Sequence, residues 1–419
     1  MSMTAAPATI DDAAARVEPK VIAIRRDIHQ HPELGNREVR TAKLVADRLR
    51  ELGIEVREKV AHTGVVGILK GGKPGKVVAL RADMDALPVT EQVDLPFASK
   101  VRTTYNGQEV GVMHACGHDA HVAILLGVAE VLAGMRKEIP GTVKFIFQPA
   151  EEGAPAGEEG GAELMVKEGV LENPKVDAIF GLHVTSRFAV GELTYRPEGM
   201  MAAVDTLTIK VHGKQTHGAY PWLGVDPIVV ASQIVLGLQT IPSRQLDSTI
   251  APSVVTIGAI HGGVRNNIIP DDVTMIGTIR SLDAKMRDEI HTRIRRTAES
   301  IAAAAGAKAD VTISTGYPIT YNDPALTEKM APTLRRVAGS GNVRLANPVL
   351  GAEDFSFYQQ KVPGLFFWVG IRPPNQTPDE APSNHSPLFF VDERGLLLGV
   401  RALAHAAVDY LSGAGGSAR

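Results

Sequence analysis

The sequence is short of three features that would each point to a particular kind of protein. Its 419 residues contain one cysteine, Cys116, so no disulfide forms within the chain and the thiol acts, if at all, as a thiolate. No apolar run approaches the ~18 residues that cross a bilayer. Lysine plus arginine number 44 against 47 aspartates and glutamates, a near balance that argues against nucleic acid or a membrane as partner. A soluble globular enzyme is the simplest expectation.

The length of the chain predicts more than one domain. At roughly 150 residues per domain, two or three domains with a sizeable core are expected. Residues 1–19 carry neither the basic start nor the apolar stretch of a secretory signal, so we expect a cytoplasmic protein.

The first part of the chain alternates between strand and helix patterns. Short apolar runs within 76–88, 142–152 and 176–184 are typical of strands buried on both faces. Apolar residues recur with a helical period in 40–53 and 119–135. This alternation predicts a mostly parallel sheet covered by helices.

The pattern changes near residue 200. From there to 313 the segments read strand, helix, strand, strand, helix, strand, which is the order of a ferredoxin-like unit. Afterwards α/β character returns and ends in a helix over 392–411. We therefore predict an α/β domain built from 1–199 and 314–419, with a mostly parallel sheet covered by helices, and a smaller ferredoxin-like α+β domain inserted at 200–313.

Residue types that bind metals gather where the predicted strands end. They are Cys116 and His118 before a helix, the adjacent Glu151 and Glu152, His183, and His385 in a proline-flanked loop. Ligand sites in open α/β sheets form outside the carboxyl ends of strands, so these segments are expected to converge.

Each of these residues alone has an ordinary structural explanation, because a lone buried cysteine is usually a small apolar filler. Together, a thiolate, imidazoles and a carboxylate suit borderline divalent ions. One of two adjacent glutamates can bind metal while the other stays free to take a proton from water. The residues indicate a metal-dependent hydrolase.

Nine segments extend this interpretation to a known family. In chain order they closely resemble the amidohydrolase branch of the aminoacylase/carboxypeptidase metallopeptidases, which includes hippurate hydrolases and plant hydrolases of indole-acetyl amino-acid conjugates. The resemblance covers about residues 20–411. The segments are RADMDALP, MHACGHDAH, FQPAEE, GLHV, GVDP, NNIIPDDV, GTIR, GAEDFSFY and NHSP.

The resemblance implies a two-metal hydrolase of N-acyl amino acids, which releases a carboxylic acid and a free amino acid. It assigns Glu151 as general base and later as proton donor to the leaving amine. Manganese or zinc is expected, with cobalt or nickel as further options. The implied ligands are Cys116, which bridges the two ions, His118, Glu152, His183 and His385.

One difference from the wider family concerns Asp83 and Asp85. Other branches carry His-x-Asp where this chain reads Asp-Met-Asp, and an aspartate bridge at the position of Cys116. We therefore expect His118 to replace the missing ligand and Asp85 to orient a histidine. Asp83 is best interpreted as a structural carboxylate.

The resemblance also implies that 1–199 and 314–419 form the catalytic domain and that the inserted ferredoxin-like α+β domain at 200–313 is a lid domain. It implies that the lid supports a homodimer or higher homo-oligomer and that His217 polarises the scissile carbonyl, in its own site or its partner's. Asn267 and Arg280 match positions that hold the substrate carboxylate, a task that suits a planar guanidinium. Tyr220 and Trp222 could stack on an aromatic acyl or amino-acid group, or simply pack within the lid.

Three alternatives stay open beside an amidohydrolase with a preference for aromatic acyl groups. The first is a dipeptidase or carboxypeptidase on the same scaffold. The second is an amidase with Cys116 as nucleophile, although no separate Cys-His-Asn pattern is visible. The third is a metal-dependent binding protein, which the presence of Glu151 disfavours.

Overall fold

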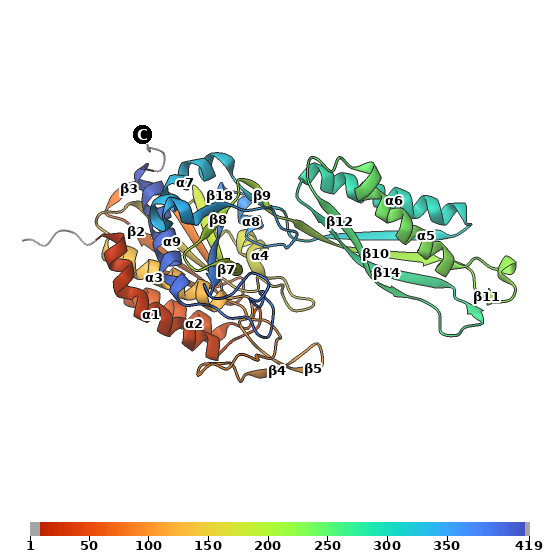
Figure 1. Ribbon diagram of the computed structural model, residues 1–419, viewed down its shortest axis with the longest axis horizontal. Helices are drawn as coiled ribbons and strands as arrows, with labels where there is room; N and C mark the ends of the chain where they lie inside the picture. The colour runs from red at the N-terminus through yellow and green to blue at the C-terminus, as the bar shows by residue number, and fades with distance from the viewer. Residues whose placement is uncertain (1–8, 415–419) are drawn as a thin grey trace, which may run out of the picture. The chain divides into compact units, whose positions relative to one another are not determined.

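The structure, a computed structural model, describes residues 9–414, which form two compact units (Figure 1). Within the described range, the first unit comprises residues 9–198, 321–346 and 357–414, and the second comprises Gly199–Thr320 and Asn347–Ser356. We call the second unit the lid. It begins and ends close to the predicted 200–313, and it also takes in a short segment from later in the chain. Residues 1–8, part of the segment inspected for a secretory signal, lie outside the described range.

The first unit is built on an eight-stranded sheet with the strand order β1-β2-β6-β3-β7-β18-β8-β17. The pairs β3–β6, β3–β7, β7–β18 and β8–β17 are parallel, whereas β1–β2, β2–β6 and β8–β18 are antiparallel. The predicted α/β class with a mostly parallel sheet is confirmed. The strands of this sheet are β1 (Glu55–Val60), β2 (Gly64–Lys70), β3 (Lys73–Asp83), β6 (Pro140–Gln148), β7 (Ala178–Ala189), β8 (Leu193–Tyr195), β17 (Val343–Leu345) and β18 (Gly364–Arg372).

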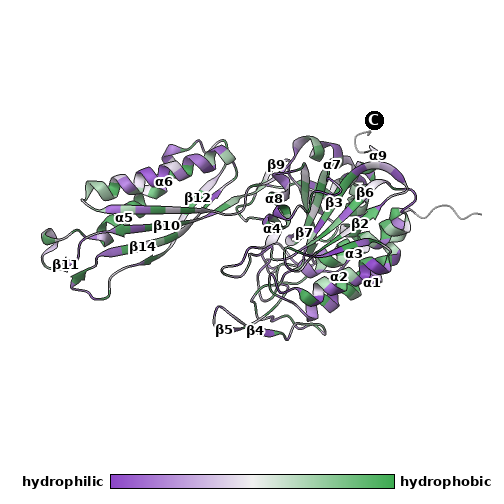
Figure 2. Cartoon of the chain, turned by 180° about the vertical axis from the view of Figure 1, so that it is seen from behind, coloured by the Kyte–Doolittle hydropathy of each residue, from purple (hydrophilic) through white to green (hydrophobic). Residues whose placement is uncertain are grey.

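Helices cover this sheet because apolar side chains line both of its faces. Helix α3 is buried nearly all round, and it packs against β3 and β7 and against helices α1 and α9. In Figure 2 the central strands and α3 are largely hydrophobic, whereas α1 carries many hydrophilic residues. The helices of this unit are α1 (Ile10–Gln30), α2 (Val39–Glu51), α3 (His118–Gly134), α4 (Gly161–Lys167), α7 (Pro324–Ala338), η3 (Ser340–Asn342) and α9 (Arg394–Ser412).

A separate two-stranded hairpin, β4 (Arg102–Tyr105) and β5 (Gln108–Gly111), lies within the first unit. Short elements also mark the passages between the units. They are β9 (Glu198–Met201), β16 (Thr320–Asn322) and α8 (Ser356–Gln359).

The lid has its own sheet and its own core. Its four-stranded antiparallel sheet has the order β12-β14-β10-β15, and α5 and α6 pack side by side on it. Alternating burial along β10 places Leu207, Ile209 and Val211 in the lid core. The observed strand-helix order is that of the predicted ferredoxin-like unit. The elements are β10 (Ala203–His212), β11 (Thr216–His217), η1 (Pro221–Leu223), α5 (Pro227–Thr240), η2 (Ile241–Gln245), β12 (Ser253–His261), β13 (Ile268–Ile269), β14 (Asp272–Ser281), α6 (Ala284–Ala304) and β15 (Lys308–Thr315).

Within residues 9–414, no helix combines the length and the apolar character that crossing a membrane requires.

Candidate metal centre

The N-terminal end of α3 carries two of the predicted ligands. Cys116 lies in the loop before the helix, and His118 is its first residue. Gly117 between them has a φ of 94°, and a Cβ there would lie 2.4 Å from a methyl carbon of Val184. Any side chain would strain this backbone and clash with β7. The glycine thus lets the Cys-Gly-His turn approach the strand that carries His183.

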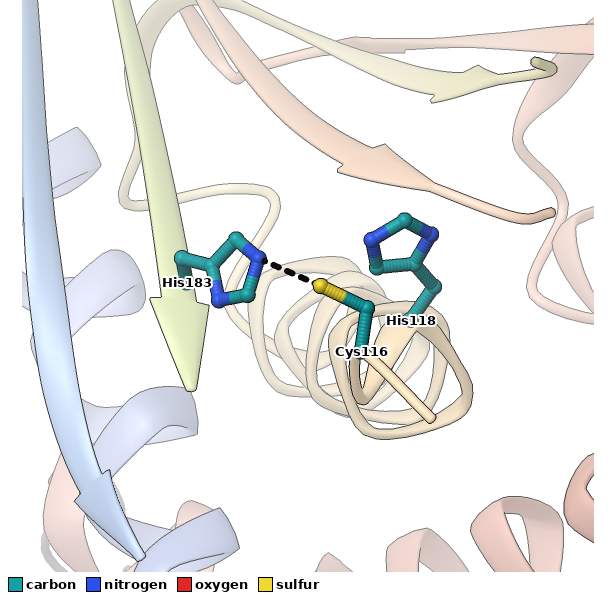
Figure 3. Close-up of side chains that lie close together, drawn as sticks. All are labelled: Cys116, His118 and His183. Atoms are coloured by element: carbon teal, nitrogen blue, oxygen red, sulfur yellow. Dashed lines mark hydrogen bonds between the residues drawn. The ribbon is translucent and has the colours of Figure 1, made fainter. Parts of the chain in front are cut away.

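Cys116 and His183 face each other, as Figure 3 shows. The Sγ atom of Cys116 lies 3.3 Å from Nε2 of His183. The other ring nitrogen, Nδ1, donates a hydrogen bond to the backbone oxygen of Val184 at 2.7 Å. Because Nδ1 holds the proton, Nε2 presents a lone pair toward the sulfur, as a metal-ligating imidazole does. The ligand atoms of Cys116, His118 and His183 lie within 4.8 Å of one another.

A second group of ligand atoms shares Cys116 with the first. Glu152 Oε1 lies 3.0 Å from His385 Nε2, and the ligand atoms of both residues lie within 4.8 Å of the Cys116 sulfur. The backbone N–H of His385 donates to the Ala115 oxygen at 2.7 Å. The side-chain nitrogen of Asn384 donates to the Cys116 oxygen at 3.0 Å. Cys116 is therefore common to both groups of candidate ligand atoms.

His118 is oriented by Asp85. Its Nδ1 atom donates to the Asp85 backbone oxygen at 2.9 Å and lies 3.2 Å from Oδ1. The other carboxylate oxygen, Oδ2, accepts a hydrogen bond from the backbone N–H of Glu152 at 2.9 Å. Asp85 thus holds the ring of one candidate ligand and the backbone of another, which is the arrangement expected of an orienting carboxylate.

The Nε2 atom of His118 tests whether these residues fit a metal ion. It is buried, and none of the described residues forms a hydrogen bond with it. It lies 3.9 Å from Glu151 Oε2 and 3.9 Å from Glu152 Oε1. Metal–nitrogen and metal–oxygen bonds of about 2.0–2.2 Å hold two ligand atoms roughly 3–4 Å apart. The spacing, the unpartnered nitrogen and the mixture of thiol, imidazole and carboxylate groups therefore fit a divalent cation.

The charges around these donors are unbalanced toward the negative side. Burial, and then the two adjacent glutamate carboxylates, raise the pKa of the Cys116 thiol well above its usual value. Burial acts to lower the pKa of His118, but Asp83 and Asp85 outweigh it and raise the pKa to about 10. A divalent cation would supply the positive charge that this donor set lacks.

Asp83 supports the scaffold instead of the ligand set. Its carboxylate accepts hydrogen bonds from Arg81 Nη1 and from His121 Nδ1, both at 2.6 Å. The other nitrogen of His121 accepts from the backbone N–H of Val184 at 2.8 Å. Asp83, His118 and His121 are close enough to hold an ion, but both nitrogens of His121 are already engaged. These contacts favour the interpretation of Asp83 as structural.

A buried carboxylate that was not predicted lies beside the site. Glu38, at the start of α2, accepts hydrogen bonds from Thr63 Oγ1 at 2.5 Å and from the Ala150 backbone N–H at 2.8 Å. Burial, and then the charge of Asp85, raise the pKa of Glu38 to about 8. Because Ala150 directly precedes Glu151, Glu38 fixes the backbone that presents the predicted base. No motif marks Glu38, since its role depends on a contact 112 residues away.

His29, for which no role was predicted, helps to fix the N-terminal end of helix α3. Its Nδ1 atom lies 2.9 Å from an Asp119 carboxylate oxygen, and its Nε2 atom lies 3.1 Å from Glu91 Oε1. Arg25 Nε donates to the same Asp119 oxygen at 2.8 Å. These buried contacts fix the first turn of α3, where His118 begins the helix.

The predicted substrate residues of the lid lie in two separate places. His217 on β11 and Asn267 beside β13 are exposed neighbours, joined by a hydrogen bond from the Gly218 N–H to the Asn267 oxygen at 2.9 Å. Arg280 is half-buried near the other end of β14, which begins at Asp272. At about 3.4 Å per residue, the strand from 272 to 280 spans about 27 Å. The lid brings His217 and Asn267 together, and it does not bring Arg280 to them.

Tyr220 and Trp222 pack on each other in the lid. Their ring centroids lie 5.6 Å apart, and Tyr220 lies 5.3 Å from the His217 ring. Tyr220 is 50% exposed and Trp222 is 73% exposed. The aromatic contacts are thus within one exposed cluster around His217.

Comparisons with known proteins agree with this geometry. Residues 79–409 match the profile of peptidase family M20/M25/M40. Thermostable carboxypeptidase 2 of Saccharolobus solfataricus is 46% identical over 93% of this chain and 94% of its own length. The IAA-amino acid hydrolase ILR1-like 4 of Arabidopsis thaliana is 41% identical over 93% of this chain and 86% of its own length.

A solved structure extends the likeness to the fold. It is a Bacillus subtilis protein described as a dinuclear metal binding peptidase of the M20 family, with 37% identity and a TM-score of 0.79. The match covers 95% of this chain and 99% of that one. The chain therefore belongs to peptidase family M20/M25/M40, and within it to the metal-dependent amidohydrolases and carboxypeptidases that hydrolyse amide bonds.

Proposed function

We propose that this chain hydrolyses N-acyl amino acids to a carboxylic acid and a free amino acid, and that it prefers aromatic acyl groups. The observation that carries the proposal is the pair of adjacent glutamates. Both carboxylates lie 3.9 Å from His118 Nε2, but only Glu152 belongs to the group with His385 and Cys116, which leaves Glu151 available as the base. The plant relative, named as a hydrolase of IAA–amino acid conjugates, supports this substrate class.

We propose two divalent ions per subunit as cofactors, manganese or zinc first, with cobalt or nickel as further options. Thiolate and imidazole ligands suit zinc, and carboxylates also suit manganese. When bound, such ions polarise the scissile carbonyl and lower the pKa of a water molecule toward ~7. The residues proposed to hold them are Cys116, His118, Glu152, His183 and His385.

The proton transfers in this proposal belong to Glu151. Its carboxylate takes a proton from the attacking water and then delivers that proton to the nitrogen of the leaving amino acid. At 6% exposure, the group is shielded from bulk water. His217 stabilises the charge that develops on the carbonyl oxygen, and Asn267 and Arg280 bind the substrate carboxylate.

The separation of the lid residues favours a homodimer or a higher homo-oligomer. The distance of about 27 Å along β14 is longer than an N-acyl amino acid. A single substrate is therefore contacted by Arg280 of one copy and by His217 and Asn267 of another. Exposed apolar side chains on strands β12 and β14, including Val254, Ile260 and Ile276, are available for such an association.

Mixing two variants of strongly reduced activity tests this arrangement. His217→Ala and Arg280→Ala chains are unfolded together, refolded and assayed. If the two residues serve one site from different copies, mixed dimers contain one intact site and regain activity. If they serve one site from the same copy, no mixture regains activity. Light scattering of the wild-type protein gives the oligomer size independently.

A carboxypeptidase or dipeptidase is the second candidate, favoured by the 46% identity to a thermostable carboxypeptidase. A cysteine amidase is disfavoured, because burial and the neighbouring carboxylates raise the pKa of Cys116 whereas a nucleophilic thiol needs a lowered one. A metal-dependent binding protein has no use for a base in the position of Glu151.

Amino-acid release from a panel of N-acyl amino acids and dipeptides separates these candidates. The protein is stripped with a chelator and assayed with and without manganese, zinc or cobalt. Metal-restored release from benzoyl and other aromatic acyl conjugates supports the proposal. Activity confined to dipeptides would favour the second candidate. Release that survives complete metal removal would favour Cys116 as nucleophile.

A further inference from the structure

A cavity of about 360 Å³ lies beside the candidate metal centre, with all of its lining residues in the first unit. Asp85 and Glu152 form part of its wall, so the cavity adjoins the predicted ligands. Thr103, Thr104 and Tyr105 of strand β4 form another part. The volume lies in the range of small-molecule pockets, about 300–1,000 Å³. Figure 1 shows the β4–β5 hairpin at the periphery of this unit.

The charge of the cavity determines which end of a substrate it suits. Arg37 is the one cation among the described lining residues, and both of its terminal nitrogens pair with Glu158, at 3.1 and 2.5 Å. Asp85 and Glu152 add negative charge. The ions proposed for the metal centre would offset these two carboxylates, but Arg37 is already paired, so the lining offers a substrate carboxylate no free cation of its own. The cavity therefore suits an uncharged group.

The remaining lining matches a flat apolar group. Besides the polar Thr103, Thr104 and Asn106, it consists of small and apolar side chains, which include Leu34, Leu87, Pro88, Pro155 and Ala156. Tyr105 adds an aromatic ring that is 40% exposed. Such a surface gains from burying an aromatic ring, because stacking adds to the hydrophobic gain.

A tight turn sets the position of Tyr105. Asn106 and Gly107 have φ values of 49° and 77°, the positive angles of a two-residue type I′ hairpin turn. The turn fixes the register so that Tyr105 pairs with Gln108 across the hairpin. Thr104 Oγ1 also donates to Glu109 Oε1 at 2.7 Å, which links the two strands a second time. These contacts set the place of Tyr105 within the hairpin that forms one wall of the cavity.

We propose that this cavity is the subsite for the acyl group and that Tyr105 determines the preference for aromatic acyl groups. The inference rests on the proposed hydrolysis of N-acyl amino acids. It assigns aromatic recognition to the first unit, whereas the sequence pointed to Tyr220 and Trp222 of the lid.

The test compares acyl groups on one amino acid. The specificity constant kcat/KM is measured for N-benzoylglycine and N-acetylglycine with the manganese-loaded enzyme. We expect Tyr105→Ala to lower the benzoyl-to-acetyl ratio about tenfold, since a stacking loss near 1.4 kcal/mol is a factor of ten. Tyr105→Phe should keep the ratio. Gln108→Ala is the matched control, because Gln108 is exposed on the same hairpin and does not line the cavity.

A second variant fills the space instead of opening it. Ala156→Phe should lower the rate for N-benzoylglycine more than the rate for N-acetylglycine. An unchanged ratio in both Tyr105→Ala and Ala156→Phe would overturn the inference while leaving the proposed function intact. So would a ratio that stays constant between acyl groups but changes between N-benzoylglycine and N-benzoylalanine, since the cavity would then hold the amino-acid side chain. A wild-type enzyme that releases no amino acid from any conjugate would instead overturn the proposed function, and the inference with it.

Discussion

In the first unit the polar residues with predicted chemistry are buried or half-buried, apart from the exposed His385, whereas in the lid only Arg280 is half-buried and the others are exposed. His118 is fully buried and Glu151 is 6% exposed, whereas His217 and Asn267 lie on the surface of the lid. The described part of the lid also buries charged groups, among them Glu353 and Asp354 in its short later segment. A third, the Asp205 carboxylate, is paired with Arg287 and with His291. Buried charge that its neighbours neutralise holds a fold together, and buried charge left unbalanced marks a site for a cation.

The largest effect is expected at the candidate metal centre, for substitution of Glu151. Glu151→Gln should lower kcat by at least about 10³-fold, because the amide cannot accept a proton from water. The bound metal should stay near the wild-type amount, since the substitution preserves shape and leaves Glu152 in place. Steady-state kinetics together with metal analysis by mass spectrometry measure both quantities.

Glu152→Gln is the matched variant, one residue away. It should lose metal together with activity, because its carboxylate belongs to the group with Cys116 and His385. Loss of metal in Glu151→Gln and retention in Glu152→Gln would mean that the roles of the two glutamates are reversed.

Asp205→Asn should act on stability and not on chemistry. Burial disfavours the Asp205 carboxylate, but hydrogen bonds from Arg287 and His291 outweigh it and hold its pKa below the ordinary 3.8. Removing this charge leaves Arg287 without its partner, so the lid should lose about 3 kcal/mol of unfolding free energy at pH 7. The rate constant kcat well below the melting temperature should not change.

The difference in unfolding free energy between the wild type and Asp205→Asn depends on pH because the pKa of Asp205 is lowered in the folded protein. A depressed pKa contributes stability above the unfolded value of 3.8, and that contribution is lost as the pH falls through the lower folded value. The gap between wild type and Asp205→Asn, measured by denaturant unfolding, should be constant above pH 5 and should narrow below pH 3.8. A gap that stays constant to pH 3 would show that the carboxylate charge is not what stabilises the lid.

The same contrast explains how much the sequence alone could predict. The strand and helix patterns of 76–88 and 119–135 correspond to β3 and α3, and the predicted ligand types do converge, because residues at strand ends share one edge of a parallel sheet. Helix α1 and the antiparallel strands β1 and β2 were not predicted. Glu38 and His29 could not be identified, because contacts between distant segments create their roles.

In the lid, the sequence predicted the secondary-structure elements but not the spacing of the site residues. Its six main elements follow the predicted order, since alternation along β10 and the long apolar stripe of α6 are strong local signals. The distance between Arg280 and His217 was not predicted. That distance depends on where each residue falls along a paired strand, and no motif records it.

His217→Ala tests the exposed side of the comparison. Loss of one donor to a developing oxyanion typically costs about 10²-fold in kcat, and we expect that loss here. Because the side chain is exposed, the melting temperature and metal content should match those of the wild type. A large fall in melting temperature with little change in kcat would mean that His217 packs against Tyr220 and does not act on the substrate.

The smallest effect is expected for Asp85, which orients the candidate ligand His118. Asp85→Asn keeps an acceptor for His118 but turns an amide NH₂ toward the backbone N–H of Glu152, where Oδ2 now accepts a hydrogen bond. We expect metal affinity to fall about tenfold, as is typical when a residue that orients a ligand is changed. Competition with a chromogenic chelator measures the affinity, and Glu138→Gln, an exposed carboxylate of the same unit, is the control. Equal metal affinity in Asp85→Asn and Glu138→Gln would mean that Asp85 supports the fold around His118 without affecting how His118 binds metal. The buried Asp85 carboxylate would then serve the scaffold, as the buried Asp205 carboxylate does in the lid.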